Sequence, residues 1–372
     1  SDLSDKSHSC PLSPAFTDAD LALYLKVCYD HARHLVQHRT TGNWLTMEMS
    51  GLYTVGAIYP EFREAAAWRN LAADALYQEL ATQFVPDGAQ IELSPGYHQV
   101  ALSNILRIPQ VAKLVGRFEE LPADYTARAE RAFDFNLKMM TPDRDLPCVN
   151  DSWAVNVPRS LAEAFTLFPE RADFQWTATD GKEGAMPGFT SLLLPYAGFA
   201  VMRSDWSRDA NFLAFDGGLL GYGHVHQDKL NVILFAYGRE MLYDDGGGQY
   251  EQSKWRRYSL DTYSHSTVIV DGQAQHRNSR DRWANVAREP LPIVWRSGSV
   301  FDYAAAVYDE PYGKEDNRPA VHRREVLFLK PDLFLVADRL EPADGEEHRY
   351  EARWQVDSTT LQPGASDRKS VV

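Results

Sequence analysis

The chain has 372 residues, of which 44% are hydrophobic, and carries a formal net charge of -14 at pH 7. This length exceeds the size at which a single hydrophobic core stops growing, so we expect two domains. The acidic balance argues against a general role in binding nucleic acid, but it leaves room for an anionic ligand in a locally basic cleft. Three cysteines, Cys10, Cys28 and Cys148, are an odd number without zinc-type spacing, so they indicate neither a disulfide framework nor a thiolate metal site.

Segments that would place the chain at a membrane are not evident. No apolar run approaches the roughly 18 to 20 residues of a membrane span. The opening stretch SDLSDKSHSCPLSPAF lacks the charged and apolar regions of a signal peptide. Because the chain also stops abruptly after GASDRKSVV, a removed leader and a fragment of a longer protein both stay open.

The first half of the chain has the spacing of amphipathic helices. Its segments are rich in Ala and Leu, begin near Asp or Pro, and repeat apolar residues at helical intervals. The clearest of them are residues 17–38, 61–84 and 123–140. They predict successive helical hairpins.

The hydrophobic period changes near residue 195. Beyond it, short runs of β-branched and aromatic residues are separated by turn residues such as Gly238 and the Pro331-Asp332 pair. These runs are residues 230–245, 266–273, 302–310 and 323–340. The change predicts an all-helical domain, residues 1–194, joined to an antiparallel β-sandwich, residues 195–372.

Three stretches of the helical half carry polar residues that packing does not require. Asn43 and Trp44 lie where a helix is expected to begin, and an Asn at that place is also an ordinary capping residue. Tyr97 and His98 open another apolar helix, so a structural role at the helix start is an alternative for them too. Asp151, in CVNDSW, either caps a turn or contacts a ligand.

A fourth stretch, GYGHVHQDKL, places His224, His226 and Asp228 at alternate positions at the mouth of a predicted strand. Successive side chains of an extended chain point to opposite faces, so we expect these three to share one face. Asp244 and His265 follow nearby in the chain. A single histidine in a strand is usually structural, but this set of five residues indicates a functional site.

Glycines crowd the same region, in DGGLLGYGHVH and YDDGGGQY. A dinucleotide-binding fingerprint lies between a strand and a helix, whereas these glycines lie between strands. They indicate backbone freedom beside an open cleft.

Together these blocks resemble a known family. HVHQDKLNVILFAYGREMLYDDGGGQY and YSHSTVIVDG are closely similar to the His-x-His-x-Asp-x-Leu, Asp-x-Gly and His-Asn-Thr blocks of the heparinase II/III-like polysaccharide lyases. The resemblance extends upstream to GNW, ELSPGYHQ and NDSW, and it spans roughly residues 40–350. It implies an α+β multidomain fold in which an incomplete (α/α) toroid precedes an antiparallel β-sandwich, in agreement with the change of period.

The resemblance also implies a reaction, β-elimination from a uronic acid. The proton on C5 is removed, the oxygen on C4 is expelled, and a 4,5-unsaturated end results. Asn43 is implied to neutralise the substrate carboxylate, because a carbanion beside a full negative charge is very unfavourable. Tyr97 and His224 are the implied acid and base, with Tyr97 preferred as acid and either residue able to act as base, according to the stereochemistry at C5. His98 is implied to orient the substrate or Tyr97.

A metal site is a further implication. In several family members a zinc ion in the sandwich, bound by two histidines and an aspartate, braces the catalytic loop. Matched block by block, the implied ligands are His226, Asp244 and His265, and zinc suits such nitrogen and oxygen ligands. The family usually has proline where this chain has Asp245, so the choice between the two aspartates stays open. We expect Asp228 to support one of the histidines.

The expected partner is an anionic polysaccharide or oligosaccharide, of heparin or heparan sulfate type first, with alginate and other uronate polymers as alternatives. Basic residues of candidate cleft loops suit such a ligand, namely Lys254, Arg256, Arg257, Arg277 and Arg280. The expected substrate contacts are Trp44, Glu48, Asp151, Trp153, Tyr222 and Arg257.

Two other functions compete with a lyase. A toroid glycoside hydrolase needs two carboxylates that flank the scissile bond, and Asp151, Glu48 and Glu92 form no convincing pair in the sequence. A carbohydrate-binding or zinc-stabilised scaffold without activity would use the same aromatics and histidines. The resemblance favours the lyase and implies a periplasmic or secreted protein of bacterial type. It leaves the oligomeric state and endo or exo action open.

Overall fold

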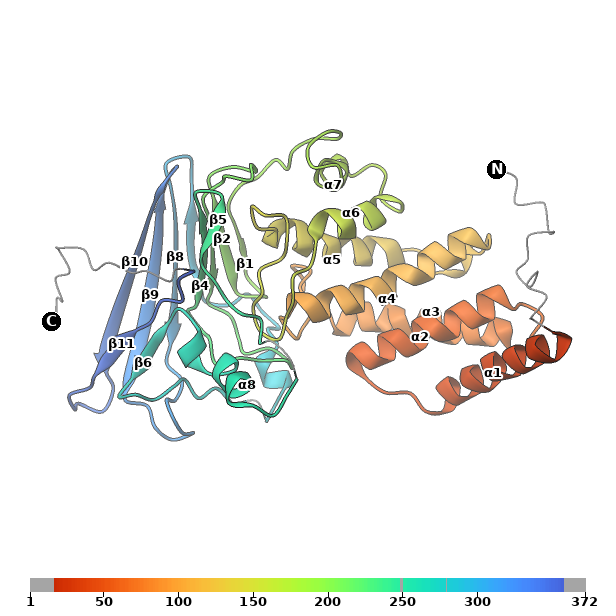
Figure 1. Cartoon of the computed structure of the whole chain (residues 1–372), viewed down its shortest axis with the longest axis horizontal. Coiled ribbons are helices and arrows are strands. Elements are labelled where there is room, and N and C mark those ends of the chain that lie inside the picture. The colour runs from red at the N-terminus through yellow and green to blue at the C-terminus, as the bar shows by residue number, and fades with distance from the viewer. Residues whose placement is uncertain (1–16, 248–249, 279, 358–372) are drawn as a thin grey trace. The chain divides into compact units, whose positions relative to one another are not determined.

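The chain forms helices and then antiparallel strands (Figure 1), and a computed structural model describes residues 17–247, 250–278 and 280–357. The α-helices are α1 (Asp18–Gln37), α2 (Gly42–Ile58), α3 (Ala65–Thr82), α4 (Pro95–Leu114), α5 (Tyr125–Met139), α6 (Val157–Phe165), α7 (Ala172–Ala178) and α8 (Lys254–Ser259). The strands are β1 (Leu192–Leu194), β2 (Phe199–Arg203), β3 (Phe212–Asp216), β4 (Val232–Ala236), β5 (Arg239–Leu242), β6 (Val268–Val270), β7 (Val294–Ser297), β8 (Phe301–Tyr308), β9 (Ala320–Leu329), β10 (Leu333–Pro342) and β11 (Tyr350–Ala352).

The segments expected from periodicity are confirmed. The three helical segments are α1, α3 and α5, and the strand segments are β4 with β5, β6, β8, and β9 with β10. Local chemistry sets their ends. At α1, the Thr17 side chain accepts a hydrogen bond from the Asp20 N–H, and the Thr17 N–H donates to the Asp20 carboxylate at 2.8 Å. Pro95 begins α4, where its missing N–H removes no helical hydrogen bond.

The described residues include no helix that is long and apolar enough to cross a bilayer. Cys28 and Cys148 are free thiols. Cys10 lies outside the described residues, as do the first 16 residues and the end of the chain from residue 358.

The chain divides into two compact units. One contains the chain up to Thr82 together with Ser103–Ala129, and the other contains Gln83–Leu102 and the chain from Glu130 onward. Helix gives way to strand between α7 and β1, close to the expected boundary at residue 194. The compact units are nevertheless divided elsewhere, because α4 and α5 contribute residues to both. The boundary at residue 194 stays a prediction about domains.

In the first unit, α2 and α3 pack closely. A Cβ atom at Gly56 would lie 2.7 Å from the Ala65 carbonyl oxygen, so only glycine allows this approach without a shift. Arg69 is buried at the contact, where it donates to the Gly56 carbonyl at 2.8 Å and pairs with Glu120 at 2.7 Å. The buried guanidinium thus has partners for its charge and its N–H groups.

In the second unit, a five-stranded antiparallel sheet, in the order β1-β2-β3-β4-β5, and a four-stranded sheet, β10-β9-β8-β7, form a sandwich. Strands β11 and β6 form a third, two-stranded sheet. Leu213 and Phe215 of β3 share one buried apolar cluster with Val326 and Phe328 of β9. Side chains of β9 alternate between buried and less buried positions, as expected for a strand with one face in the core. The segments that connect these strands carry the three predicted metal ligands and His224.

Candidate active site and metal centre

Tyr97 and His224 lie against each other with parallel rings. Their ring centroids are 3.5 Å apart and the ring planes differ by 10°. Tyr97 is in the first turn of α4, which is anchored because the Ser94 hydroxyl donates to the Asp151 carbonyl and the Gly96 N–H donates to the Ser152 hydroxyl at 2.9 Å. Two residues more than 120 positions apart in the chain therefore form one pair.

His224 belongs to the loop between β3 and β4, and its φ of 59° is in the left-handed region. A non-glycine residue in this region costs about 1 kcal/mol, so the surrounding contacts must hold it there. The Asp151 N–H donates to the His224 carbonyl at 3.0 Å, and the His226 N–H donates to the Asn150 side chain at 2.9 Å. The prediction that residues 224 to 228 are extended and share one face is wrong, because this loop turns at His224.

A second tyrosine connects this pair. The Tyr250 hydroxyl lies 2.9 Å from the Tyr97 hydroxyl and 2.8 Å from Nδ1 of His224. The guanidinium of Arg256 lies over the Tyr250 ring, 4.8 Å from its centroid. Partial burial, the hydrogen bond to Tyr97 and the nearby Asp151 charge all raise the pKa of Tyr250, so its hydroxyl keeps its proton.

Asp151 bridges the two histidines of the loop. One carboxylate oxygen, Oδ2, lies 3.3 Å from Nδ1 of His224, and the other, Oδ1, lies 3.0 Å from Nε2 of His226. Arg256 binds both oxygens, at 2.5 and 2.6 Å. Burial alone would raise the pKa of Asp151, but the hydrogen bonds from His224, His226 and Arg256 hold it well below its usual range. Asp151 is therefore a permanent anion between the two imidazoles.

Gly247 makes room for this arrangement. Its φ is 78°, and a Cβ atom there would lie 2.5 Å from the Asp151 carboxylate and 2.6 Å from the Arg256 guanidinium. The Gly247 carbonyl also accepts a hydrogen bond from Arg256 at 2.7 Å. The glycine run was interpreted as backbone freedom beside a cleft, and Gly247 in addition permits a close approach to a charged pair. Gly248, the last glycine of the run, lies outside the described residues.

His226, Asp244 and His265 form a buried group whose ligand atoms lie within 4.8 Å of one another. The carboxylate of Asp244 accepts from Asn231 at 2.8 Å and lies 2.8 Å from Nδ1 of His265. Nδ1 of His226 and Nε2 of His265 are buried without a hydrogen-bond partner in the described part of the chain. Buried polar atoms are rarely left so, and two imidazole nitrogens beside a carboxylate are the ligands that zinc prefers. The residues present therefore fit a metal ion.

The electrostatic surroundings also suit a cation. Burial would lower the pKa of His265, but the negative charge and hydrogen bond of Asp244 outweigh burial and raise it to about 9. Of the two candidate aspartates, Asp244 belongs to this group. The Asp245 carboxylate instead accepts from the Ser259 hydroxyl at 2.6 Å and from the Gly247 N–H at 2.9 Å.

Asp228 is buried close to this group without bonding either imidazole. The carboxylate that holds the ring of His226 is Asp151, and the one that holds His265 is Asp244. Asp228 acts on both histidines through its charge, and burial raises its own pKa. Its nearest cationic partner is Arg277, 3.8 Å away. The expected support of a histidine by Asp228 is therefore indirect.

His98 lies in the core rather than at a surface. It is 1% exposed, Nδ1 accepts from the Gln90 N–H at 3.2 Å, and Nε2 lies 3.1 Å from the Ala132 carbonyl oxygen. Burial lowers its pKa to about 3, so the ring is neutral. This placement does not favour a direct substrate contact, whereas an indirect role in orienting Tyr97 from the next position stays a prediction.

The remaining predicted contacts of the second unit differ in exposure. Trp153 is 46% exposed and meets Tyr97 edge to face at 5.5 Å. Tyr222 is half-buried, and its ring is 4.8 Å from that of Trp283. Arg257 is exposed on α8. Their roles in substrate binding stay predictions.

Arg277 and Arg280 do not fit the expectation of free cleft cations. Arg277 is buried, donates to the Gly218 carbonyl at 2.9 Å and faces Glu310 at 3.5 Å. Arg280 is exposed and paired with Glu315 at 3.3 Å. Arg256 is engaged by Asp151. The sequence pattern could not show these partners, because they come from distant loops.

Three predicted residues lie on α2, in the first unit. Asn43 is buried, Trp44 is 68% exposed, and the Glu48 carboxylate accepts from the N–H and hydroxyl of Thr40 at 3.0 and 2.9 Å. The N-cap of α2 is Thr41, so Asn43 is not the capping residue. The capping alternative for Asn43 is therefore wrong, and its proposed contact with substrate stays a prediction.

Two residues near His224, Tyr250 and Glu92, were not predicted from the sequence as part of a lyase site. Tyr250 comes two positions after the glycine run and is 63% exposed, and a polar aromatic residue so close to a glycine-rich loop was the available signal. The carboxylate of Glu92 lies 3.7 Å from Nε2 of His224. The sequence offers Glu92 only as half of a hydrolase pair, and nothing in it places Glu92 opposite Asp151 across an imidazole.

Family models and relatives agree on where this chain belongs. Residues 2–176 match the model described as Heparinase II/III N-terminus, and residues 186–371 match Heparinase II/III-like, C-terminal. The chain is a member of the heparinase II/III-like family. The predicted fold class, an incomplete (α/α) toroid followed by an antiparallel β-sandwich, is confirmed.

Several curated relatives and solved structures resemble the chain. A heparin-sulfate lyase of Bacteroides stercoris is 30% identical over 88% of this chain and 48% of its own length. One of Pedobacter heparinus is 31% identical with the same coverage. Among solved structures, a heparinase III matches with a TM-score of 0.76 and 26% identity, covering 89% of this chain and 50% of that protein. The chain thus spans about half the length of these relatives.

Proposed function

We propose that the protein is a polysaccharide lyase that cleaves a uronic-acid-containing glycan by β-elimination. The observation that carries this proposal is the stacked Tyr97–His224 pair. The Tyr250 hydroxyl lies within 2.9 Å of both the Tyr97 hydroxyl and Nδ1 of His224. Proton removal and proton donation on one sugar need two such groups side by side. Neither Tyr97 nor His224 depends on a protonated carboxylic acid, which a glycoside hydrolase would need.

Each residue has a distinct task in this proposal. Tyr97 donates a proton to the glycosidic oxygen on C4, and His224 or Tyr97 takes the proton from C5, according to the stereochemistry at that carbon. Asp151 holds the His224 ring by Nδ1 and stabilises its protonated form. Asn43 is assigned to the substrate carboxylate, where a hydrogen-bond donor lowers the cost of charge that develops next to C5.

The carboxylates near His224 do not favour a glycoside hydrolase. An inverting or retaining mechanism needs one carboxylic acid that donates its proton to the leaving group. Asp151 cannot play this part, because Arg256 binds both of its oxygens and its pKa lies far below the usual range. Asp151 is also not free to act as the ionised base or nucleophile beside Glu92, because His224, His226 and Arg256 occupy both of its oxygens.

The proposed substrate is a glycan of heparin or heparan sulfate type. The relatives named heparin-sulfate lyase support this choice, since they align with 88% of the chain. A specific observation keeps a second candidate: an alginate lyase of Stenotrophomonas maltophilia is 25% identical over 41% of the chain. Both polymers offer the uronate that the mechanism requires. We further propose, from the family alone, a periplasmic or secreted location.

We propose zinc as the ion held by His226, Asp244 and His265. Bound there, it would supply positive charge and fixed geometry behind the loop that carries His224. The support is the donor set and the two unpartnered ring nitrogens. His226 would then link the metal to Asp151 through Nε2, and Asp151 would link it to His224.

The test is a product assay on four polymers: heparan sulfate, chondroitin sulfate, hyaluronan and alginate. A lyase releases unsaturated ends that absorb in the ultraviolet, whereas a hydrolase releases reducing ends without that absorbance. We expect ultraviolet-absorbing product from heparan sulfate first. Reducing ends without absorbance would overturn the lyase, and product from alginate alone would replace the proposed substrate.

A further inference from the structure

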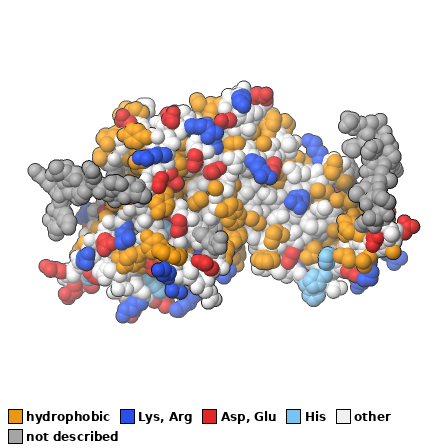
Figure 2. Space-filling view, viewed as in Figure 1, with side chains coloured by type: hydrophobic (Ala, Val, Ile, Leu, Met, Phe, Trp, Pro, Cys, Tyr) orange, Lys and Arg blue, Asp and Glu red, His pale blue; other side chains and the backbone are white. Residues whose placement is uncertain are grey.

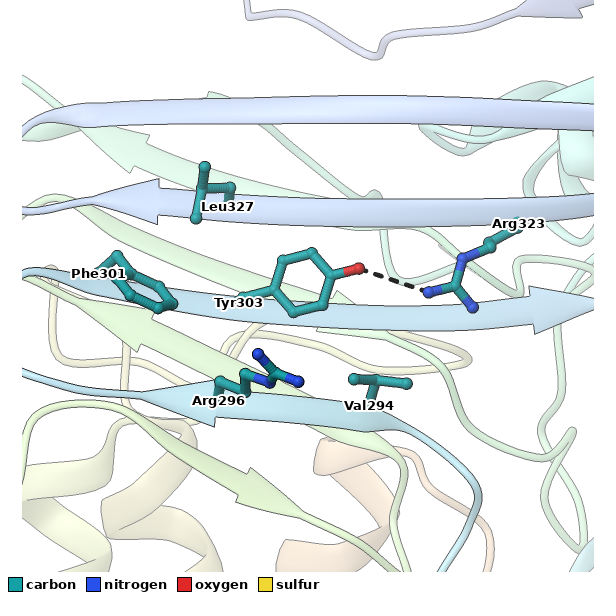
Figure 3. A pocket seen from close by; sticks show the side chains of 6 residues that line it. All are labelled: Val294, Arg296, Phe301, Tyr303, Arg323 and Leu327. Atoms are coloured by element: carbon teal, nitrogen blue, oxygen red, sulfur yellow. Dashed lines mark hydrogen bonds between the residues drawn. The ribbon is translucent and has the colours of Figure 1, made fainter.

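A second recess lies on the outer face of the four-stranded sheet and shares no residue with the Tyr97–His224 pair. It has a volume of about 440 Å³, which is within the usual range for small-ligand sites. Six side chains of β7, β8 and β9 line it (Figure 3), and these are Val294, Arg296, Phe301, Tyr303, Arg323 and Leu327. We call this recess the outer-sheet pocket.

Strand register explains why these side chains meet. Arg296 of β7 is opposite Tyr303 of β8, and Tyr303 is opposite Leu327 of β9. Phe301 is two residues from Tyr303 and therefore on the same face of β8. The neighbouring positions on β8 and β9, such as Ala304 and Val326, point into the core. The pocket is thus a strip of aromatic rings on the face opposite the core.

Two guanidinium groups flank this strip. The Tyr303 hydroxyl accepts a hydrogen bond from Nη2 of Arg323 at 3.4 Å, and Arg323 also donates from Nε to Glu325 at 2.7 Å. Arg296 is exposed, and no carboxylate in the described part of the chain pairs with it. None of the six lining residues is acidic.

The charge of the pocket lining differs from that of the protein as a whole. The chain carries a net charge of -14, and Figure 2 shows acidic and basic side chains interspersed over the face in view. Within the pocket, by contrast, both charged lining residues are positive. Guanidinium groups bind sulfate and carboxylate groups in planar, two-pronged geometry, and aromatic rings offer apolar surface to the C–H faces of sugar rings.

We propose that the outer-sheet pocket is an auxiliary binding site for an anionic saccharide segment, with Arg296 and Arg323 on its acidic groups and Phe301 and Tyr303 beneath its rings. The choice of an anion follows from charge complementarity. The choice of a saccharide rests on the proposed lyase function. The site would hold a distant part of a long polymer while another part is cleaved, so it would matter for long chains and not for short ones.

The test measures binding separately from cleavage. The 372-residue chain carrying Tyr97→Phe, which should slow turnover by roughly 10² to 10⁴, is titrated with size-defined heparan sulfate fragments of twelve or more sugars at several salt concentrations. Arg296→Ala combined with Arg323→Gln should weaken binding about three- to tenfold. It should also lower the slope of log Kd against log salt by about 1.4, as expected when two cationic contacts to a linear polyanion are lost at roughly 0.7 per contact.

Arg159→Ala combined with Arg208→Gln is the matched control, because both arginines are exposed, each is paired with a carboxylate outside the four-stranded sheet, and neither lines the pocket. It removes two charges of the same kind and should change Kd less than twofold. With Tyr97 intact, the pocket variant should keep its turnover on a tetrasaccharide. Equal affinity and equal salt slope in the pocket variant and the control would overturn the proposal.

Two further outcomes separate the proposals. If the chain forms no unsaturated product but the pocket variant loses fragment binding, the auxiliary site stands and the lyase function falls. If unsaturated product forms and the pocket variant binds the fragments as tightly as the unaltered pocket does, only the auxiliary site is overturned. Sedimentation velocity is run on both proteins, because a pocket variant that dissociates an oligomer would show a contact between copies of the chain and overturn the glycan assignment.

Discussion

His224 and His226 are two residues apart, and both bind the Asp151 carboxylate, yet their surroundings are opposite. The side chain of His224 is 27% exposed and stacks on Tyr97, whereas that of His226 is fully buried beside His265. An exposed imidazole between carboxylates can exchange protons with a substrate. A buried imidazole with an unpartnered nitrogen can hold a metal ion. Environment, and not residue type, therefore suits the two histidines to different tasks.

Asp151 makes the two sides interdependent. Each of its oxygens is committed to one histidine, and Arg256 fixes both. A disturbance on the metal side can therefore move the ring on the reactive side by way of one carboxylate. Single substitutions on either side can show whether the two sides act separately.

Replacing Tyr97 by Phe should affect the reactive side alone. The ring that stacks on His224 remains, so melting temperature should stay within a degree or two, on the order of the change for a mild surface substitution. Loss of the acid–base hydroxyl should reduce kcat by roughly 10² to 10⁴. Rates of unsaturated-product formation by folded protein provide the measurement, and near-normal turnover would show that Tyr97 is not the acid.

Replacing Asn43 by Ala asks whether the reactive side needs a residue of the first unit. If its amide stabilises the substrate carboxylate as charge develops, kcat should fall more than KM rises, by about 3 kcal/mol in the barrier. Thr41→Ala is the control, because Thr41 is the N-cap of α2 but its side chain makes no capping hydrogen bond, so turnover should be unchanged. An Asn43→Ala variant with a lower melting temperature but normal turnover per folded molecule would assign Asn43 a structural role instead.

Replacing His226 by Ala should affect the metal side first. Metal content should fall, and the protein should lose about 3 kcal/mol of stability if zinc is present at roughly a hundred times its Kd. His224→Ala should lower activity and leave metal in place. Elemental analysis and melting curves, with and without a chelator, decide the matter, and full metal occupancy in the His226 variant would remove the division between the two histidines.

Replacing Arg256 by Gln should weaken the Asp151 bridge between the two histidines, and the resulting loss of stability should depend on pH. The pKa of Asp151 is depressed in the folded protein, so its stabilising effect is complete above its unfolded pKa of about 3.9 and is lost as pH falls through the folded value. Without the guanidinium, the folded pKa should rise toward 3.9 and the effect should shrink.

The difference in melting temperature between wild type and the Arg256 variant should therefore be largest near neutral pH and should narrow below about pH 4. Arg257→Gln serves as the control, since Arg257 is exposed on the same helix. His224 and His226 still bond Asp151 in the variant, so a difference that stays unchanged from pH 7 down to about pH 2 would mean that Arg256 acts through packing and not through the charge of Asp151.

The order of helices and strands, the family and the residue types of the site could be predicted from the amino-acid sequence alone. Periodicity depends on neighbours along the chain, so α1, α3, α5 and the sandwich strands could be predicted from it. The family resemblance implied His226 and His265 as ligands with either Asp244 or Asp245, and the fold brings Asp244 to them. Which groups share a charge depends on the packing of distant segments. The Asp151 bridge joins residues more than 70 positions apart, and Gly247 allows the approach.

Burial and loop conformation were equally beyond the sequence. The left-handed turn at His224 gives this residue different surroundings from His226, although the two are only two positions apart. The core encloses His98, although His98 directly follows Tyr97 in the chain. The outer-sheet pocket arises from the register of three strands, which no single segment encodes. Distances between side chains, and therefore their pKa values and their roles, follow from the packing of segments that are remote in sequence.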